Sequence, residues 1–264
     1  MVSNKSMFQQ FDKLFIPFIT AGDPNEELTI DLALILEKCG ASAIELGVPY
    51  SDPLADGPVI QQASIRARRN GMNIEKAMEL AYKMKERGLK IPIILFTYFN
   101  PVLQLGEKYF FTLMEKNRLE GLLIPDLPFE ESGWMRKKCD EHGIYFISMV
   151  APTSYNRIKK IAENAAGFLY CVSSLGVTGE RQSFDERVSD FISHVKKYAE
   201  VPVAVGFGIS SNEHVKKFFK ISDGVVVGSA IVKQIEKLIP LLTNANTKQS
   251  GLQEFERFIN GLLH

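Results

Sequence analysis

Short apolar runs alternate along the chain with longer segments in which apolar residues recur at helical spacing. The first run, residues 14–20, ends in the turn Ala21-Gly22-Asp23-Pro24, and a helical pattern follows as far as Cys39. We predict seven further strands, at residues 43–49, 91–98, 121–125, 145–151, 168–173, 201–207 and 224–228. Helical patterns follow these strands at residues 73–87, 107–117, 130–142, 154–164, 185–200, 212–219 and 230–241.

This alternation predicts the fold. Strictly alternating strands and helices indicate a parallel sheet, and eight strands in 264 residues indicate that the sheet closes into a barrel. We therefore expect one (β/α)8 TIM barrel that spans residues 1–264 as a single domain. An open, doubly wound sheet is the alternative, but no G-x-G-x-x-G motif follows the first strand to support it.

The two ends of the chain extend this unit. Residues 3–12 predict a short amphipathic helix with Met7, Phe8 and Phe11 on one side, and we expect this additional N-terminal helix to close the bottom of the barrel. Residues 243–250 are polar and predict a loop. Residues 251–264 predict a final helix that packs on the outside.

Composition narrows the function classes. Lysine plus arginine equals aspartate plus glutamate, at 31 each, and no basic cluster stands out, which disfavours nucleic acid and anionic membranes as partners. Cys39, Cys139 and Cys171 are far apart, which argues against a disulfide framework or a zinc site. No apolar run approaches the roughly 20 residues of a spanning helix, and the first residues are not typical of a signal peptide. We expect a soluble cytoplasmic protein.

One carboxylate lies in the middle of a predicted strand. In residues 43–49 the apolar side chains at 44, 46 and 48 share one face, so Glu45 shares the other face with the small residues Ala43 and Gly47. If that second face is the barrel interior, loss of water raises the pKa of Glu45 and makes it a candidate general acid–base. The alternative is a buried acid with a structural partner, but no basic residue lies nearby in the sequence.

Active sites of barrels lie at the C-terminal ends of the strands, so polar groups at those ends are the other candidates. Asp52 and Asp56 follow the Glu45 strand, although Asp56 within Asp56-Gly57-Pro58 is also ordinary turn chemistry. Other polar groups at these ends are Tyr98, Asn100, Asp126 and Tyr170.

Three glycine-bearing turns follow the last three strands: Gly176-Val177-Thr178-Gly179, Gly206-Phe207-Gly208-Ile209-Ser210 and Gly228-Ser229-Ala230. Glycines that lead into helices let backbone N–H groups approach an anion, and this is the usual phosphate site of a barrel. A single such turn would more simply be a connection from strand to helix. Three together favour a phosphate site built from amides and the Ser229 hydroxyl.

The sequence disfavours the two common aldolase designs. No lysine lies within a predicted strand, which argues against a Schiff-base enzyme. The four histidines, His142, His194, His214 and His264, fall in helices or at the tail rather than at strand ends, which argues against a metal-dependent enzyme.

Five motifs, in order, resemble those of the bacterial tryptophan synthase alpha subunit family, and the resemblance covers nearly the whole chain. They are Pro17-Phe18-Ile19-Thr20-Ala21-Gly22-Asp23-Pro24, the block from Glu45-Leu46-Gly47-Val48-Pro49 to Asp56-Gly57-Pro58, Gly176-Val177-Thr178-Gly179, Gly206-Phe207-Gly208-Ile209-Ser210 and Gly228-Ser229-Ala230-Ile231-Val232.

The resemblance implies a lyase of tryptophan biosynthesis, a pathway of aromatic amino-acid biosynthesis. It cleaves indole-3-glycerol phosphate into indole and glyceraldehyde 3-phosphate by a retro-aldol step, without a cofactor in this chain and without a metal. It also implies a partner, the tryptophan synthase beta subunit, which holds pyridoxal phosphate and receives indole through a tunnel in an α2β2 heterotetramer.

The resemblance also assigns residues. Glu45 matches the family's acid–base and Asp56 its second catalytic carboxylate. The residues that match the indole pocket are Phe18, Phe96, Tyr98, Tyr170 and Phe207. The residues that match the phosphate site are Thr178, Gly179, Gly208, Gly228 and Ser229. Phe18 and Phe96 also fit a plain barrel core.

Further segments match the family less directly. Residues 179–187 are similar to a lid over the ligand, and we expect this lid to be mobile in the empty enzyme. The loop around Asp52, with residues 100–101 and 126–128, matches the partner-facing surface. The chain departs from the family at Ser174, where many members have arginine.

Two other functions stay open at this point. A free-standing indole-3-glycerol-phosphate lyase would use the same catalytic residues, and activity with and without a beta chain separates it from an alpha subunit. The second alternative function is that of a catalytically idle barrel that only activates a partner subunit. The presence of Glu45 and Asp56 argues against it.

Overall fold

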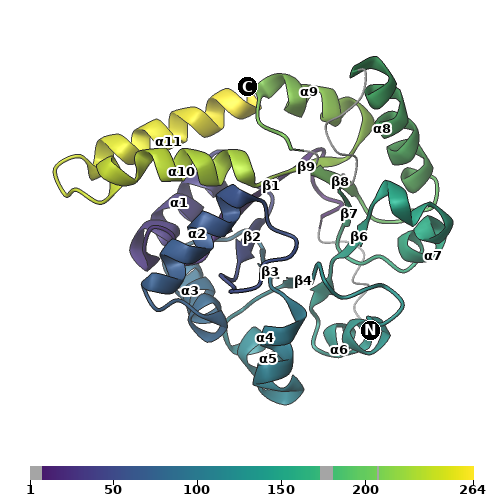
Figure 1. Cartoon of the computed structure of the whole chain (residues 1–264), viewed down its shortest axis with the longest axis horizontal. Coiled ribbons are helices and arrows are strands. Elements are labelled where there is room, and N and C mark those ends of the chain that lie inside the picture. Colours follow the sequence, from purple (N-terminus) through teal and green to yellow (C-terminus); the bar gives the residue numbers. More distant parts are fainter. Residues whose placement is uncertain (1–7, 173–180, 207) are drawn as a thin grey trace.

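The computed structural model describes residues 8–172, 181–206 and 208–264, the side chains of residues 181–186 excepted. In these residues nine parallel strands form a ring with helices around it (Figure 1). The strands are β1 Leu14–Thr20, β2 Ile44–Gly47, β3 Ile93–Phe96, β4 Gly121–Leu123, β5 Tyr145–Phe146, β6 Ser148–Val150, β7 Leu169–Val172, β8 Val203–Gly206 and β9 Gly224–Val227. Their order in the sheet is β5-β4-β3-β2-β1-β9-β8-β7-β6.

The ring closes through one stretch of chain. β5 pairs with β4, β6 pairs with β7, and only Ile147 separates β5 from β6. The Ile147 N–H donates to the Leu122 carbonyl at 2.8 Å, so this stretch stays attached to β4 up to the point where it begins to follow β7. The single strand expected at residues 145–151 is therefore present in two parts, and the expected TIM barrel is confirmed.

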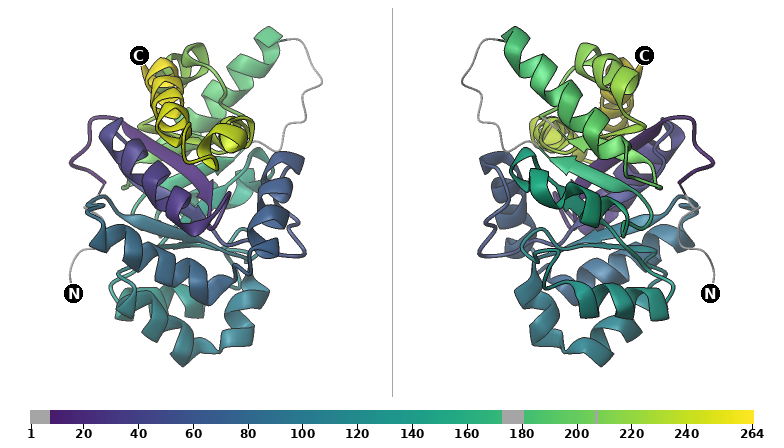
Figure 2. Two further views of the ribbon diagram at one scale, coloured as in Figure 1. Left: turned by 90° about the vertical axis from the view of Figure 1, so that its left-hand side faces the viewer. Right: turned by 90° about the vertical axis from the view of Figure 1, so that its right-hand side faces the viewer.

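Helices surround the strands in the side views as well (Figure 2). They are α1 Glu26–Lys38, α2 Pro58–Arg69, α3 Ile74–Glu86, α4 Phe99–Leu105, α5 Glu107–Lys116, α6 Gly133–Glu141, α7 Ile158–Ala162, α8 Arg181–Lys196, α9 Asn212–Ile221, α10 Ser229–Leu242 and α11 Lys248–Leu263, with the 3-10 helix η1 Pro152–Arg157 before α7. Side chains that cap N-termini define where several of them begin: Asn25, for example, accepts from the Leu28 N–H at 2.9 Å. In the described residues no helix has the length and apolar character needed to cross a membrane.

Two helices were missed by the sequence prediction. The buried stripe of α2 consists of the small residues Ala63, Ser64 and Ala67, which leave no strong apolar period in the sequence. α4 has only seven residues and includes Pro101. Both follow strands that carry candidate site residues, so the missed helices lie beside the site.

The expected N-terminal helix is not confirmed. Residues 8–10 form a turn, and residues 1–7 lie outside the described residues. Phe8 is nevertheless 1% exposed, and its ring meets Tyr145 and Phe168 edge-on, with centroids 6.1 and 5.4 Å away. Because Tyr145 begins β5 and Phe168 precedes β7, Phe8 fills the barrel at the N-terminal end of the strands.

The apolar core has two layers. One cluster fills the barrel, with residues such as Leu14, Ile16, Ala43 and Phe168. A larger cluster lies between the strands and the helices. All seven residues of β1 are buried because the strand is covered on both faces, as in other parallel sheets.

Candidate active site

Glu45 projects from β2 into the barrel. Its neighbours in register are Phe18 on β1 and Ile94 on β3. The side chain is 1% exposed, and its Oε1 atom has no hydrogen-bond partner among the described residues. Burial raises the pKa of Glu45 to about 8. A carboxyl in this state is protonated at neutral pH and close to its titration point.

Two aromatic rings lie over glycines on neighbouring strands. Phe18 lies against Gly47, where an added Cβ would be 2.3 Å from the ring. Tyr170 lies against Gly206, where an added Cβ would be 2.5 Å from the Tyr170 hydroxyl oxygen. A side chain at either glycine would push the ring aside, so these glycines allow both rings to lie inside the barrel.

Tyr170 faces the same interior space as Glu45. Burial raises the pKa of the Tyr170 hydroxyl well above its usual range, and the charge of Glu45 raises it further. Phe96 packs edge-on against Phe18, with centroids 5.4 Å apart. It also packs against the barrel cluster and against a small separate cluster of Phe18, Ala63 and Val232. The structure thus places Glu45, Phe18 and Phe96 on the neighbouring strands β2, β1 and β3, which form one aromatic wall, and Tyr170 on β7 faces them across the barrel interior.

Asp56 lies in the loop after β2 and is half-buried. Burial raises the pKa of its carboxyl to about 6, and a hydrogen bond with the Tyr98 side chain works against that rise. The Tyr98 hydroxyl also accepts from the Ala55 N–H at 2.9 Å, and its ring stacks on Tyr50 at 5.2 Å. Tyr98 therefore anchors the loop that carries Asp56, in addition to any contact with a ligand.

The three other strand-end groups have different surroundings. Asp126 accepts from the Phe99 N–H at 2.9 Å, at the start of α4. Asn100 donates from Nδ2 to the Tyr50 hydroxyl at 2.9 Å. Asp52 is exposed. These three groups are not gathered around Glu45.

The predicted phosphate site is described in part. Gly228 caps the N-terminus of α10, and a Cβ added to it would be 3.5 Å from the Phe18 Cβ, so this turn adjoins the aromatic wall. Gly208 and Ser229 are exposed. Thr178, Gly179 and Phe207 lie outside the described residues, as do Ser174 and the first part of the expected lid.

Thr20 is a polar interior residue that the sequence prediction missed. It is the last residue of β1, is 2% exposed, and its Oγ1 atom has no partner among the described residues. The signal was available, because Thr20 is two positions after Phe18 and therefore on the same face.

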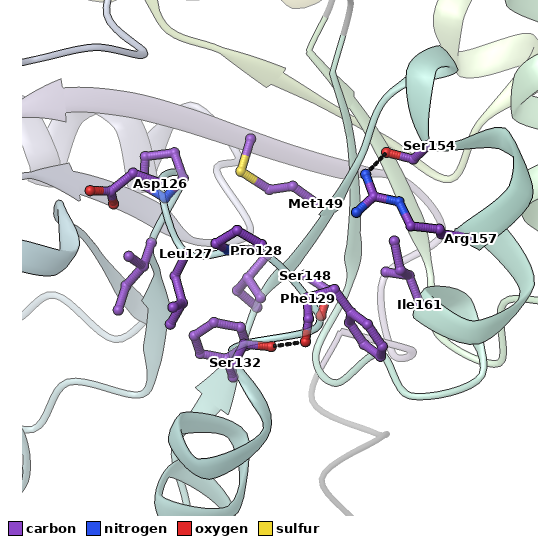
Figure 3. Close-up of a pocket in the computed structure, with 14 residues that line it drawn as sticks. Asp126, Leu127, Pro128, Phe129, Ser132, Ser148, Met149, Ser154, Arg157 and Ile161 are labelled. Carbon is purple, nitrogen blue, oxygen red and sulfur yellow. Dashed lines mark hydrogen bonds between the residues drawn. The ribbon is translucent and has the colours of Figure 1, made fainter.

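A separate pocket of about 320 Å³ opens between the loop after β4 and the segment from β6 to α7 (Figure 3). Asp126, Pro128 and Met149 lie along it, and Arg157 points toward Ser154, to whose hydroxyl it donates at 3.4 Å. Asp126 is a strand-end candidate that lines this pocket, whereas Glu45 and Asp56 do not line it. In the described residues no cluster of three or more His, Cys, Asp or Glu could hold a metal ion.

Comparison with known proteins identifies the family. The family model described as tryptophan synthase alpha chain matches residues 5–262. The chain belongs to the tryptophan synthase alpha chain family. It is thus a lyase of tryptophan biosynthesis, an alpha subunit that cleaves indole-3-glycerol phosphate.

Similar proteins agree with this assignment. The tryptophan synthase alpha chain of Bacillus pumilus is 64% identical over 250 residues, which are 95% of this chain and 94% of that protein. That of Bacillus subtilis strain 168 is 60% identical over 250 residues, again 95% of this chain and 94% of that protein. The crystal structure of tryptophan synthase subunit alpha from Legionella pneumophila has a TM-score of 0.87 at 30% identity and covers 100% of this chain and 97% of that one.

Proposed function

We propose that Glu45 is the acid–base residue of the alpha reaction. The observation that carries this proposal is a fully buried carboxyl on the inner wall of the barrel, with an oxygen that has no partner among the described residues. Burying a polar group without a partner is costly, so a site that keeps one is expected to use it on a ligand.

The chemistry needs such a group. Cleavage of the bond between indole C3 and the glycerol carbon requires a proton at C3, and the bond electrons remain with the ring. The hydroxyl on the glycerol carbon loses its proton as that carbon becomes the aldehyde of glyceraldehyde 3-phosphate. Glu45 is protonated at neutral pH, so it donates the first proton and, once ionised, accepts the second.

Asp56 is the second carboxylate in this proposal. With a pKa of about 6, it is mostly ionised at neutral pH. Protonation of indole C3 puts positive charge on the ring nitrogen, and a carboxylate that accepts the ring N–H stabilises that charge. The hydrogen bond with Tyr98 supports the ionised form and holds Asp56 in place.

The remaining site residues bind the two ends of the substrate. Flat rings suit the indole, and the proposed ring contacts are Phe18, Phe96, Tyr98, Tyr170 and Phe207. Backbone amides at the start of a helix suit the phosphate, and the proposed contacts are Thr178, Gly179, Gly208, Gly228 and Ser229. The short distance from the Gly228 position to Phe18 supports the idea that one substrate spans both groups.

We further propose that this single-domain chain works in the cytoplasm with a beta subunit, as a heterotetramer in which only the beta subunit holds pyridoxal phosphate. A structure from Pyrococcus furiosus, described as the structural basis of mutual activation of the tryptophan synthase a2b2 complex, supports this partner. That structure has a TM-score of 0.80 at 33% identity and covers 96% of this chain and 98% of that one.

An indole-release assay tests the proposal. Purified chain is given indole-3-glycerol phosphate, with and without a beta subunit, and free indole or tryptophan is measured. We expect slow indole release by the chain alone and faster turnover in the complex. Equal rates in the two conditions would support a free-standing lyase, and turnover by Glu45→Gln at the unchanged rate would remove Glu45 from its role.

A further inference from the structure

Two helices begin at the proposed site and lie against each other. α2 starts directly after Asp56 and Gly57, and Gln61 on its first turn donates to the Asp56 carbonyl at 2.9 Å. α10 starts at Ser229, after Gly228. A Cβ added to Gly228 would be 3.8 Å from the side chain of Ile60 on α2. The carboxylate end and the phosphate end of the site are therefore carried by adjoining helices.

A small apolar cluster packs these helices over the aromatic wall. Its buried members are Phe18 on β1, Ala63 on α2 and Val232 on α10, at 5%, 0% and 1% exposure. Small and branched side chains let the helices approach closely, but apolar contacts have no preferred direction and resist sliding weakly. A directional contact is needed to define how far one helix lies along the other.

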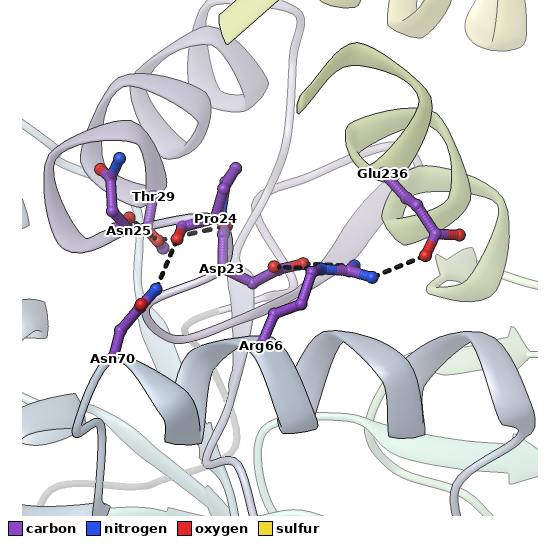
Figure 4. A network of polar contacts seen from close by, with 7 residues as sticks. All are labelled: Asp23, Pro24, Asn25, Thr29, Arg66, Asn70 and Glu236. Carbon is purple, nitrogen blue, oxygen red and sulfur yellow. Dashed lines mark hydrogen bonds and ion pairs between the residues drawn. The ribbon is translucent and has the colours of Figure 1, made fainter. Parts of the chain in front are cut away.

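Arg66 supplies that contact (Figure 4). Its Nε and Nη2 atoms donate to the two carboxylate oxygens of Asp23, at 2.8 and 2.9 Å, and its Nη1 donates to Glu236 on α10 at 2.6 Å. Asp23 is 3% exposed and lies in the loop after β1. A planar guanidinium held by three bonds has little freedom, so it defines geometry as well as charge.

A surface ion pair between two other helices differs from this contact. Lys83 on α3 and Glu26 on α1 form one contact of 2.6 Å, with side chains 51% and 42% exposed. The Arg66 side chain is 24% exposed and joins three elements that each carry part of the site: the end of β1, α2 and α10. A further bond, from Asn70 Nδ2 to the Pro24 carbonyl at 2.8 Å, holds the end of α2 to the same loop.

We propose that Arg66 is a positioning residue for the alpha reaction. By holding α2 against α10 and the β1 loop, it sets the distance between Asp56 and the amides that precede and begin α10. This inference rests on the proposed roles of Asp56, Gly228 and Ser229. A misplacement of a catalytic group by about 1 Å can lower a rate on the order of 10²-fold. Arg66 can therefore affect the rate without touching the substrate.

Kinetics of four variants test the proposal: Arg66→Met, Arg66→Lys, Glu236→Gln and the matched control Arg69→Lys, which changes an exposed arginine on the same helix. Each is assayed as the complex with the beta subunit, at a temperature where circular dichroism shows it folded. We expect Arg66→Met to lower kcat/KM roughly 10- to 100-fold. Arg66→Lys keeps the positive charge but lacks the planar guanidinium, so its kcat/KM should lie between those of Arg66→Met and the unchanged enzyme. Arg69→Lys should match the unchanged enzyme.

Product binding separates positioning from general damage. Indole and glyceraldehyde 3-phosphate each occupy one end of the site. Their separate inhibition constants should therefore stay nearly unchanged in Arg66→Met, while kcat/KM for the intact substrate falls. Equal losses for substrate and both products, or wild-type kcat/KM per folded Arg66→Met molecule, would overturn the inference. Absence of indole formation by the unchanged complex would instead overturn the proposed function.

Glu236→Gln keeps the test decisive if Arg66→Met does not fold. This variant retains the Asp23 pair and weakens only the bond between Arg66 and α10. We expect a smaller loss of kcat/KM in the same direction, again with the product constants retained. Kinetics identical to those of the unchanged enzyme would contradict the role of the α10 contact.

Discussion

Glu45 on β2 and Asp23 just after β1 are both buried acids, but they differ in whether a basic side chain pairs with them. Their exposures are 1% and 3%, and burial raises the pKa of both. Arg66 opposes the rise at Asp23 with two hydrogen bonds, whereas Glu45 has an oxygen with no partner among the described residues. The paired acid holds elements together, and the unpaired acid is left for a substrate.

The comparison predicts opposite phenotypes. Removing the acid group of Glu45 should affect turnover and leave the fold intact, because no contact within the described chain is lost at its free oxygen. Removing Asp23 should affect the fold, because the Arg66 guanidinium loses two of its three bonds.

Glu45→Gln should have the largest effect. The amide has nearly the same shape but cannot donate and recover a proton, so we expect indole formation to fall about 10³-fold, within the range for a general acid–base. Single-turnover indole release measures the loss, and near-UV circular dichroism checks the fold. The exposed Glu131 provides the control, Glu131→Gln; a loss of folding in Glu45→Gln would contradict the comparison.

Asp56→Asn should have the next largest effect, on the order of 10²-fold, because an amide cannot balance positive charge on the indole nitrogen. The pH dependence gives a second measurement. In the unchanged enzyme kcat/KM should fall below about pH 6, where Asp56 takes up a proton, and this acid limb should disappear in Asp56→Asn. An acid limb that persists unchanged would assign it to another group.

Asp23→Ala should destabilise the protein by about 3 kcal/mol, the lower part of the range for breaking a buried ion pair, since Arg66 is 24% exposed. Urea unfolding measures the free energy of unfolding. Asp12→Ala, at an exposed position, is the control. A change within the error of the control would mean that Asp23 contributes nothing to the fold.

The last prediction concerns the pH dependence of stability. The pKa of Glu45 is about 8 in the folded state and 4.5 in an exposed carboxyl, so the folded chain keeps a proton that the unfolded chain releases. The wild type should therefore lose stability relative to Glu45→Gln as pH rises from about 4.5 to about 8, by on the order of 1 kcal/mol per pH unit at most. Urea unfolding at both ends of this range measures the difference, and a constant difference would contradict the burial of an unpaired acid.

Much of the fold could be predicted because the strands are buried on both faces. The apolar run at β1 matches the observed strand at both ends, and Glu45 stood out as a carboxylate within such a run. The helix α2 could not be seen, since its packing face consists of Ala63, Ser64 and Ala67 and its neighbour was unknown.

Contacts between distant residues account for what the sequence did not reveal about the site. Arg66 and Asp23 are 43 positions apart, and so are Tyr98 and Ala55. Such pairs depend on which helix packs beside which loop, and neither composition nor periodicity encodes that arrangement. Tyr98 was therefore predicted as a pocket residue, whereas its hydrogen bonds also give it a part in holding the Asp56 loop.

The rings of Phe18 and Tyr170 over Gly47 and Gly206 bear on how this enzyme could be adapted to bulkier substrates. Because each ring fills the space above a bare stretch of backbone, trimming Phe18 or Tyr170 opens room without moving a strand, while enlarging either glycine closes it. Variants that accept substituted indoles are therefore best sought at the aromatic member of each pair.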